Sequence, residues 1–179
     1  MYHPMKNMNN QEKNTYVRQH ILSALLELMS TQDFAAISIQ ALVDAAGVGR
    51  ASFYRNYKSK EDVLRQEAER LMQTWGKEFE AEEHSSPNEL LISLLDFYKE
   101  HKEFYLAIHA AGMSDIVLNT ILKATIITPD LPNAIAYLKS SIAYMIYGWV
   151  IEWMNRGMQE SGTELAKMIA QAQGTGIDQ

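Results

Sequence analysis

Residues 38–64, SIQALVDAAGVGRASFYRNYKSKEDVL, contain two short helical patterns on either side of a glycine-rich break. Ser38 is a good N-cap for the first pattern, in which apolar residues recur at helical spacing. Gly47 and Gly49 interrupt it, because glycine reaches positive φ without a Cβ penalty. A second helix is predicted from about Arg50 to Tyr57. Two short helices joined by a tight glycine turn are typical of a helix-turn-helix.

The second predicted helix has the composition of a DNA-reading helix. Phe53 and Tyr57 form its buried side, and small or polar residues cover its open side. Arg50 could donate two hydrogen bonds to the edge of a guanine, and the Ala51 methyl could contact the methyl group of a thymine. Hydroxyl, amide and ammonium groups are donors that bind phosphate oxygens. Lys60 lies in the first turn of the next helix, where free N–H groups also attract phosphate. The candidate DNA contacts are Ser38, Arg50, Ala51, Ser52, Tyr54, Arg55, Asn56 and Lys60. A plain helical hairpin inside a larger all-α protein is the alternative.

Helical patterns flank this hairpin on both sides. Residues 15–30 carry an apolar face that completes a three-helix unit, and a connector helix is predicted from Ser59 to about Glu80. Residues 1–14 are polar and lack an apolar core, so we expect a mobile arm and no secretory signal. The predicted domains are this arm, a helix-turn-helix domain at 15–60 and a helical body at 61–179.

The composition favours an all-α protein of the reducing cytoplasm. Apolar residues make up 47% of the 179 residues, there are only 4 prolines, and β-branched runs are short. The chain has no cysteine, which excludes disulfides, thiolate nucleophiles and Cys-ligated metals.

The net charge of −6 is unevenly distributed along the chain. Residues 1–60 carry 7 basic and 4 acidic side chains, a balance of 7 − 4 = +3, and the remainder carries 9 − 18 = −9. A basic head on an acidic body is typical of a DNA-binding domain fused to a regulatory domain, although a short chain can show such asymmetry by chance.

The body, beyond Pro87, repeats helical patterns almost to the end of the chain. Residues 142–154 are apolar nearly all round, yet this segment of 13 residues with Glu152 inside it is too short and too polar to span a bilayer. A helix that is apolar on every side must be buried on every side, so we expect a second copy of the chain against it. The predicted dimer interface comprises Tyr144, Tyr147, Trp149, Ile151, Trp153, Leu165 and Met168.

Residues 15–64 resemble the DNA-binding domain of the TetR/AcrR family of bacterial transcription regulators. The resemblance rests on residues 45–48, AAGV, and on residues 53–64, FYRNYKSKEDVL, with their Phe-Tyr pair, an aromatic three residues later and Lys-Glu at the start of the next helix. Gly49 departs from the usual Ser or Asn, which we expect to tune affinity without abolishing DNA binding. Residues 94–105 and 147–158 resemble the regulatory domain of a subgroup common in Firmicutes.

The resemblance implies a homodimer held by the last two helices of each subunit and an effector pocket inside the body. The candidate pocket residues are Trp75, Phe79, Tyr98, Phe104, His109, Met113, Tyr144 and Tyr147. Aromatic and Met residues at helical spacing also suit a plain core, and nothing in the sequence identifies a ligand. A small molecule and a partner protein both stay open as the effector.

No enzyme signature, cofactor motif or metal site is predicted. The sequence lacks the Gly-x-Ser-x-Gly nucleophile elbow, the His-Glu-x-x-His zinc motif, a phosphate-binding loop and a dinucleotide-binding Gly-x-Gly-x-x-Gly motif. Adjacent Glu82, Glu83 and His84 are predicted to form a solvated loop. We therefore expect a cytoplasmic regulator, by resemblance more often a repressor than an activator, that binds double-stranded operator DNA and no membrane. The alternative is a helical adaptor that keeps the fold and acts through a protein partner.

Overall fold

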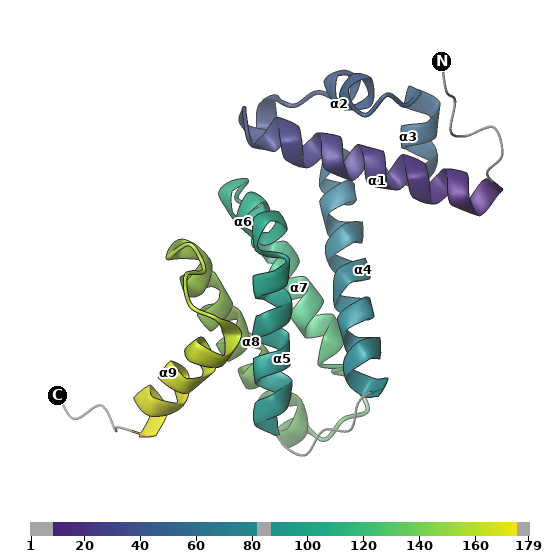
Figure 1. The fold of residues 1–179 in the computed structure, drawn as a ribbon. Helices are drawn as coiled ribbons and strands as arrows, with labels where there is room; N and C mark the ends of the chain where they lie inside the picture. The colour runs from purple at the N-terminus through teal and green to yellow at the C-terminus, as the bar shows by residue number, and fades with distance from the viewer. Residues whose placement is uncertain (1–8, 82–86, 175–179) are drawn as a thin grey trace. The chain divides into compact units, whose positions relative to one another are not determined.

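The computed structural model describes residues 9–81 and 87–174, and every regular element in these ranges is a helix (Figure 1). The all-α class expected from the sequence is confirmed. The chain divides into two compact units, Met1–Glu67 and Ala68–Gln179. The first unit is called the head below and the second the body.

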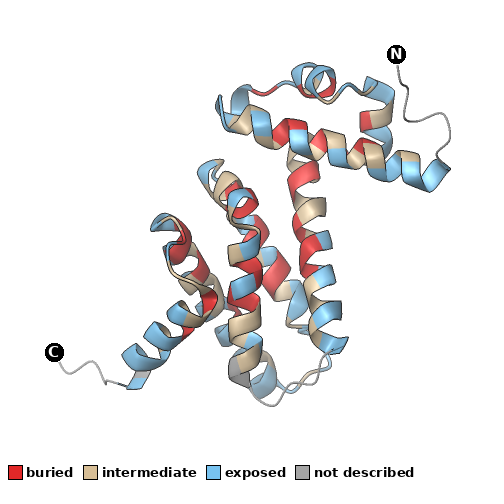
Figure 2. Ribbon diagram, viewed as in Figure 1, coloured by how far each residue is buried: buried red, intermediate tan, exposed pale blue. Residues whose placement is uncertain are grey.

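The head contains α1 (Asn10–Met29), the short 3₁₀ turn η2 (Phe34–Ala36), α2 (Ile39–Ala45), α3 (Arg50–Asn56) and the beginning of α4 (Lys60–Ala81). Helix α1 packs on α2 and α3. The fully buried side chains come from all four helices, and their positions are red in Figure 2. They are Ile21, Leu25, Leu42, Phe53, Val63 and Leu64.

Helix α1 begins at Asn10, five residues before the expected start at Thr15. Asn9 forms a capping box with Glu12: its side-chain oxygen accepts from the Glu12 N–H at 2.9 Å, and its own N–H donates to the Glu12 carboxylate at 2.8 Å. The expected arm at 1–14 is therefore wrong for residues 10–14, which are helical. Residues 1–8 of that arm lie outside the described residues.

The boundary between the units falls at 67/68, inside α4, and not at the expected 60/61. The physical reason is that Val63 and Leu64, in the first turns of α4, are fully buried. Helix α4 runs from Lys60 to Ala81 and therefore contributes residues to both units.

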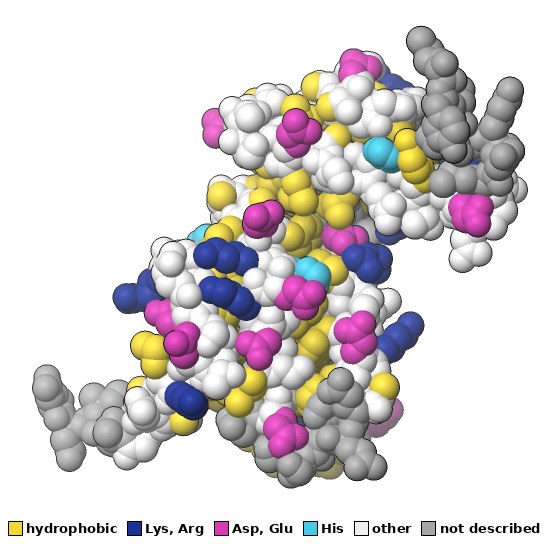
Figure 3. Space-filling view, viewed as in Figure 1, with side chains coloured by type: hydrophobic (Ala, Val, Ile, Leu, Met, Phe, Trp, Pro, Cys, Tyr) yellow, Lys and Arg dark blue, Asp and Glu magenta, His cyan; other side chains and the backbone are white. Residues whose placement is uncertain are grey.

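The body comprises the rest of α4 with α5 (Pro87–Glu100), α6 (Lys102–Ala110), α7 (Asp115–Ala124), α8 (Asn133–Asn155) and α9 (Gly162–Gly174). Helix α9 packs on α5, and α7 and α6 both pack on α8. The core is built from aliphatic and aromatic side chains such as Leu95, Tyr98, Tyr105, Ile108, Val117 and Val150. On the visible face of the body, acidic side chains are scattered and do not form one patch (Figure 3).

Helix α8 is buried on one side only. Val150, Trp153 and Met154 lie in the core, whereas Tyr137 is 70% and Tyr144 is 53% exposed. Among the described residues, α8 is the one helix that is long and apolar enough to cross a membrane. The core helix of a soluble protein meets the same criteria of length and composition. The expectation of all-round burial is thus not met by a single copy of the chain.

The turn between α8 and α9 has an unusual backbone that a lysine stabilises. Gly157 and Met158 have φ of 74° and 49°. The Lys99 ammonium, on α5, donates to the carbonyl of Met158 at 2.6 Å and to that of Gln159 at 2.9 Å. Directly afterwards, α9 starts at Gly162, where an added Cβ would lie 2.6 Å from the backbone nitrogen of Asp96.

Candidate nucleic-acid interface and body groove

The glycine turn between α2 and α3 has the geometry that its sequence predicts. The Ser38 hydroxyl accepts from the Ala41 N–H at 3.1 Å and caps α2. Gly47 has a φ of +63°, and the Val48 N–H then donates to the Val43 carbonyl at 3.0 Å. Gly49 starts α3 without a side-chain cap. A helix-turn-helix is therefore present at residues 38–57.

Helix α3 separates an inner from an outer face. Phe53 is fully buried and Tyr57 is 4% exposed, as expected. On the outer face, Arg50, Ala51, Tyr54 and Arg55 are exposed, and Ser52 and Asn56 are half-buried. Seven residues at about 1.5 Å each give a rod of about 10 Å, which fits within the width of a DNA major groove.

Some polar groups of α3 already have partners within the helix. The Arg55 guanidinium donates to the Ser52 hydroxyl at 2.9 Å, and the Asn56 amide donates to the Ser52 carbonyl at 2.8 Å. The Arg50 guanidinium lies over the Tyr54 ring, 5.7 Å from its centroid. Arg50 keeps its donors for an acceptor outside the protein, because the ring contact uses only its charge.

The structure gives Lys60 a different role from the predicted phosphate contact. Its ammonium donates to the carbonyls of Phe34, Ala35 (3.1 Å) and Ile37 (2.8 Å), and it lies 4.5 Å from the centroid of the Phe34 ring. An ammonium has three N–H donors, and these carbonyls use all three. Lys60 therefore holds the segment that leads into α2, and in this structure its ammonium has no N–H donor left for a phosphate.

A second side chain near the start of α4 contacts the end of the recognition helix α3. The Gln66 amide donates to the Asn56 carbonyl at 3.2 Å and to the Asp62 carboxylate at 3.0 Å. Asp62 also accepts from the Lys58 N–H at 2.8 Å. Burial raises the pKa of Glu61, but the Ser59 hydroxyl, with further help from Lys60 and Arg65, holds that pKa below its ordinary value. Sequence analysis missed Gln66, because its partner lies ten residues away and is a backbone atom.

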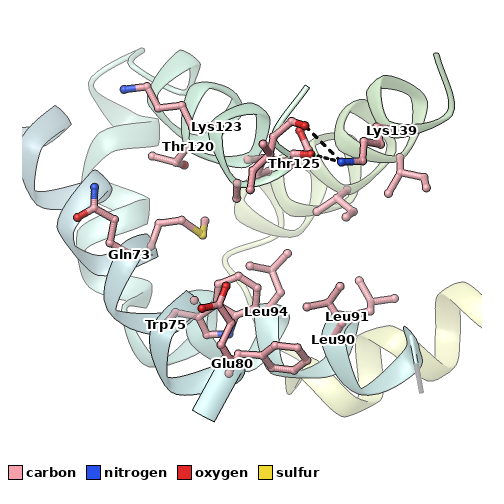
Figure 4. Close-up of a pocket in the computed structure, with 18 of the residues that line it drawn as sticks. Gln73, Trp75, Glu80, Leu90, Leu91, Leu94, Thr120, Lys123, Thr125 and Lys139 are labelled. Carbon is pink, nitrogen blue, oxygen red and sulfur yellow. Dashed lines mark hydrogen bonds between the residues drawn. The ribbon is translucent and has the colours of Figure 1, made fainter. Parts of the chain in front are cut away.

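The body contains a groove of about 920 Å³ that is lined by α4, α5, α7 and α8 (Figure 4). Trp75 and Phe79 of α4 stack at 5.7 Å between ring centroids, and the Trp75 indole N–H donates to the Ser93 hydroxyl at 3.0 Å. Most of the remaining wall is aliphatic. Its side chains include Met72, Leu90, Leu91, Leu94, Ile121, Ile142, Met145 and Ile146. Volume and lining are those of a site for a largely apolar molecule.

Of the eight predicted pocket residues, Trp75 and Phe79 line this groove. The structure contradicts the others as groove-lining residues. Tyr98, Phe104 and Met113 are buried in the core, and Tyr144 and Tyr147 lie on the side of α8 away from the groove. The His109 ring nitrogens contact the Ser114 hydroxyl (2.8 Å) and the Asn155 side-chain oxygen (2.9 Å).

Tyr98 lies next to the groove and does not line it. Its side chain is fully buried, and burial raises the pKa of its hydroxyl above the ordinary value, an effect that the nearby hydroxyl of Thr120 partly opposes. Thr120 is itself 3% exposed and lines the groove.

The predicted dimer residues divide between three environments. Three of them, Tyr144, Tyr147 and Ile151, lie on the outward side of α8. Tyr137 lies on the same side, seven residues before Tyr144. Met168 of α9 is 52% exposed and Leu165 is half-buried. Trp149 lines the groove and Trp153 is 2% exposed in the core, so neither lies on the outward side of α8. Sequence periodicity alone does not show which apolar side of such a helix meets its own domain.

The predicted solvated loop with Glu82, Glu83 and His84 lies outside the described residues. Within 9–81 and 87–174, no group of three or more His, Asp or Glu side chains could hold a metal ion.

Residues 21–66 match the sequence model of the family described as bacterial regulatory proteins, tetR family. The matched residues include α2, the glycine turn and α3, which form the helix-turn-helix. The resemblance stated from residues 15–64 is thereby confirmed: this part of the chain is similar to the DNA-binding domain of tetR-family regulatory proteins.

Two solved structures share the fold over nearly the whole chain. Lin0861 from Listeria innocua has a TM-score of 0.76 at 18% sequence identity, with 94% of each chain covered. A putative TetR-family transcriptional regulator from Syntrophomonas wolfei has a TM-score of 0.61 at 17% identity, covering 92% of this chain and 97% of its own. No curated protein matches the sequence. These likenesses show that the fold is shared through both the head and the body.

Proposed function

We propose that the chain is a cytoplasmic, homodimeric repressor whose affinity for operator DNA is changed by a molecule bound in the groove of the body. The observation that carries DNA binding is the outer face of α3. Arg50, Ala51 and Tyr54 stand there on a helix whose other side is fixed by the buried Phe53. An exposed arginine beside a methyl group offers donors and an apolar contact to base edges.

Helix α4 supports the proposed effect of a ligand on DNA binding. Lys60 and Gln66, at its start, hold the segment before α2 and the end of α3. Met72, Trp75 and Phe79, on the same continuous helix, form one wall of the groove. A ligand that displaces this wall displaces the helix that carries both contacts, and a ligand changes the equilibrium only through such a differential interaction.

The outward side of α8 supports the homodimer. Tyr137 and Tyr144 are large, exposed and seven residues apart, and the exposed Met168 of α9 adds apolar surface. An isologous pairing of these helices covers the surface and gives two heads. Two recognition helices then read half-sites in successive major grooves, about 34–36 Å apart.

The deciding experiment is binding of the purified protein to DNA flanking its own gene and to random DNA of equal length, over a salt series. We expect selective binding that weakens as salt rises, because phosphate contacts release counterions. Equal binding to both DNAs at every salt concentration would refute the regulator mechanism and favour the adaptor that acts through a protein partner.

A further inference from the structure

We propose that the groove binds an amphipathic carboxylate, a molecule with one anionic head and an unbranched or aromatic apolar tail. The head contacts the Lys139 ammonium, and the tail lies between α4 and α5. This inference rests on the proposed function of the groove as the effector site.

Lys139 supplies the one charge in the groove that suits a buried anion. Its ammonium donates to the Thr125 carbonyl at 2.9 Å and to the Ile126 carbonyl at 3.3 Å, as drawn in Figure 4. These contacts fix the ammonium at the end of α7 and use two of its three N–H donors. No carboxylate among the described residues pairs with it. The third donor is thus available to an oxygen of a ligand.

The other charged side chains of the groove are screened or already paired. Glu69 forms an ion pair with Lys123. Lys77 and Glu80 are exposed, whereas Lys139 is half-buried. Exposed charges contribute little to binding because water and salt screen them, and a partly desolvated charge attracts its partner more strongly. The electrostatics of the groove therefore favour an anion at Lys139 over a cation at Glu80.

The rest of the groove accepts an apolar tail. Leu90, Leu91 and Leu94 of α5 lie on the groove together with Trp75 of α4 (Figure 4), and Phe79 stacks on Trp75. Burial of each methylene group in such a site strengthens binding about fourfold. A small inorganic anion lacks this contribution, so the tail is as necessary for binding as the head.

The test is a comparison of three ligands with the same chain length: dodecanoate, dodecanol and dodecyltrimethylammonium, each kept below its micelle-forming concentration. Trp75 and Trp149 line the groove, so tryptophan emission of the full chain reports binding without any DNA. We expect dodecanoate to bind at least about tenfold more tightly than either analogue, since a charge-assisted contact contributes at least about 1.4 kcal/mol.

Three variants locate the contact. Lys139→Gln removes the charge and is expected to abolish the preference for dodecanoate, whereas Lys139→Arg keeps the charge and most of the preference. Lys167→Gln, at an exposed lysine of α9 that does not line the groove, is the control and should bind like the unchanged protein. A thermal unfolding curve of each variant confirms that α7 and α8 remain folded.

Equal or tighter binding of the uncharged or cationic analogue would overturn the proposal, as would an unchanged preference in Lys139→Gln. Failure of all three ligands to bind would also overturn it. Selective operator binding by the same preparation would then show that the regulator function stands without this ligand class.

Discussion

Arg50 lies on the outer face of α3, and its guanidinium is held over the ring of Tyr54. We expect Arg50→Ala to reduce the free-energy preference for operator over random DNA by about 1–3 kcal/mol. This is the contribution of a bidentate contact with a base. The measurement is a pair of binding curves, on operator and on random DNA, at one salt concentration. An equal loss on both DNAs would show that Arg50 contacts phosphate and not a base edge.

Lys60 is predicted to act through the stability of the head. Lys60→Met removes the donors to the carbonyls of Phe34, Ala35 and Ile37, and we expect the free energy of unfolding to fall by about 1–3 kcal/mol. Chemical denaturation measures this value. Lys58→Met, at an exposed lysine two residues earlier, is the control and should change stability little. If the Lys60→Met protein were fully stable but bound DNA more weakly, Lys60 would be a phosphate contact and not a stabilising residue.

Tyr98 makes the stability of the body sensitive to alkaline pH. Its folded-state pKa is raised above the ordinary value of 10.0 by burial. Below pH 10, Tyr98 is protonated in both states and contributes no pH dependence. Above pH 10, the unfolded chain releases this proton and the folded chain keeps it. The free energy of unfolding therefore falls by up to about 1.4 kcal/mol per pH unit.

We expect Tyr98→Phe to lose less stability between pH 10 and 11 than the unchanged protein. Denaturant unfolding at pH 8, 10 and 11 measures the difference. The other tyrosines titrate in both proteins and cancel. The same loss in both proteins would mean that Tyr98 reaches water in the folded state.

At the level of elements, replacing either glycine of the turn by serine is expected to change the stability of the head, and the two changes should have opposite signs. Gly49 has φ −76° and an added Cβ meets nothing within 4 Å, so Gly49→Ser supplies the missing cap of α3 and should stabilise the head by about 0.5–1 kcal/mol. Gly47 has φ +63°, and Gly47→Ser should destabilise it by about 1–2 kcal/mol. Thermal unfolding of the two serine variants measures these changes. If both variants were stabilised or both destabilised, the argument from the helix cap would be contradicted.

The helices of the head could be predicted because their signals are local. Ser38, the glycine turn and the spacing of Phe53 and Tyr57 all act within a few residues, and local periodicity captures such patterns. The early start of α1 was also readable, since Asn9 and Glu12 stand at capping-box spacing. The carbonyl partners of Lys60 were not readable, because they lie 23–26 residues earlier and are backbone atoms.

The groove could be predicted only in part, for a related reason. Trp75 and Phe79 could be predicted because periodicity places both on the connector helix, whose second half enters the body. The leucines of α5 and Lys139 of α8 reach the groove only through packing of helices that are distant in sequence. Trp153 was misplaced because periodicity shows that a residue is apolar and not which neighbour covers it.

For the whole molecule, the outward side of α8 is predicted to hold the dimer together. We expect Tyr144→Glu to convert a dimer of twice 20.4 kDa into a monomer, because it places a charge in an apolar contact. Sedimentation measures the mass. Ala110→Glu, at an exposed position of α6, is the control and should stay dimeric. A dimeric Tyr144→Glu protein, or a monomeric unchanged protein, would contradict this assignment.

The start of α9 at Gly162 has a consequence for the proposed dimer. Any side chain at this position would collide with the backbone of Asp96 on α5, so a substitution must lift the last helix away from the body. The same helix carries Met168 on its exposed side. A substitution at Gly162 would therefore also move the exposed side of α9 that we propose for the dimer.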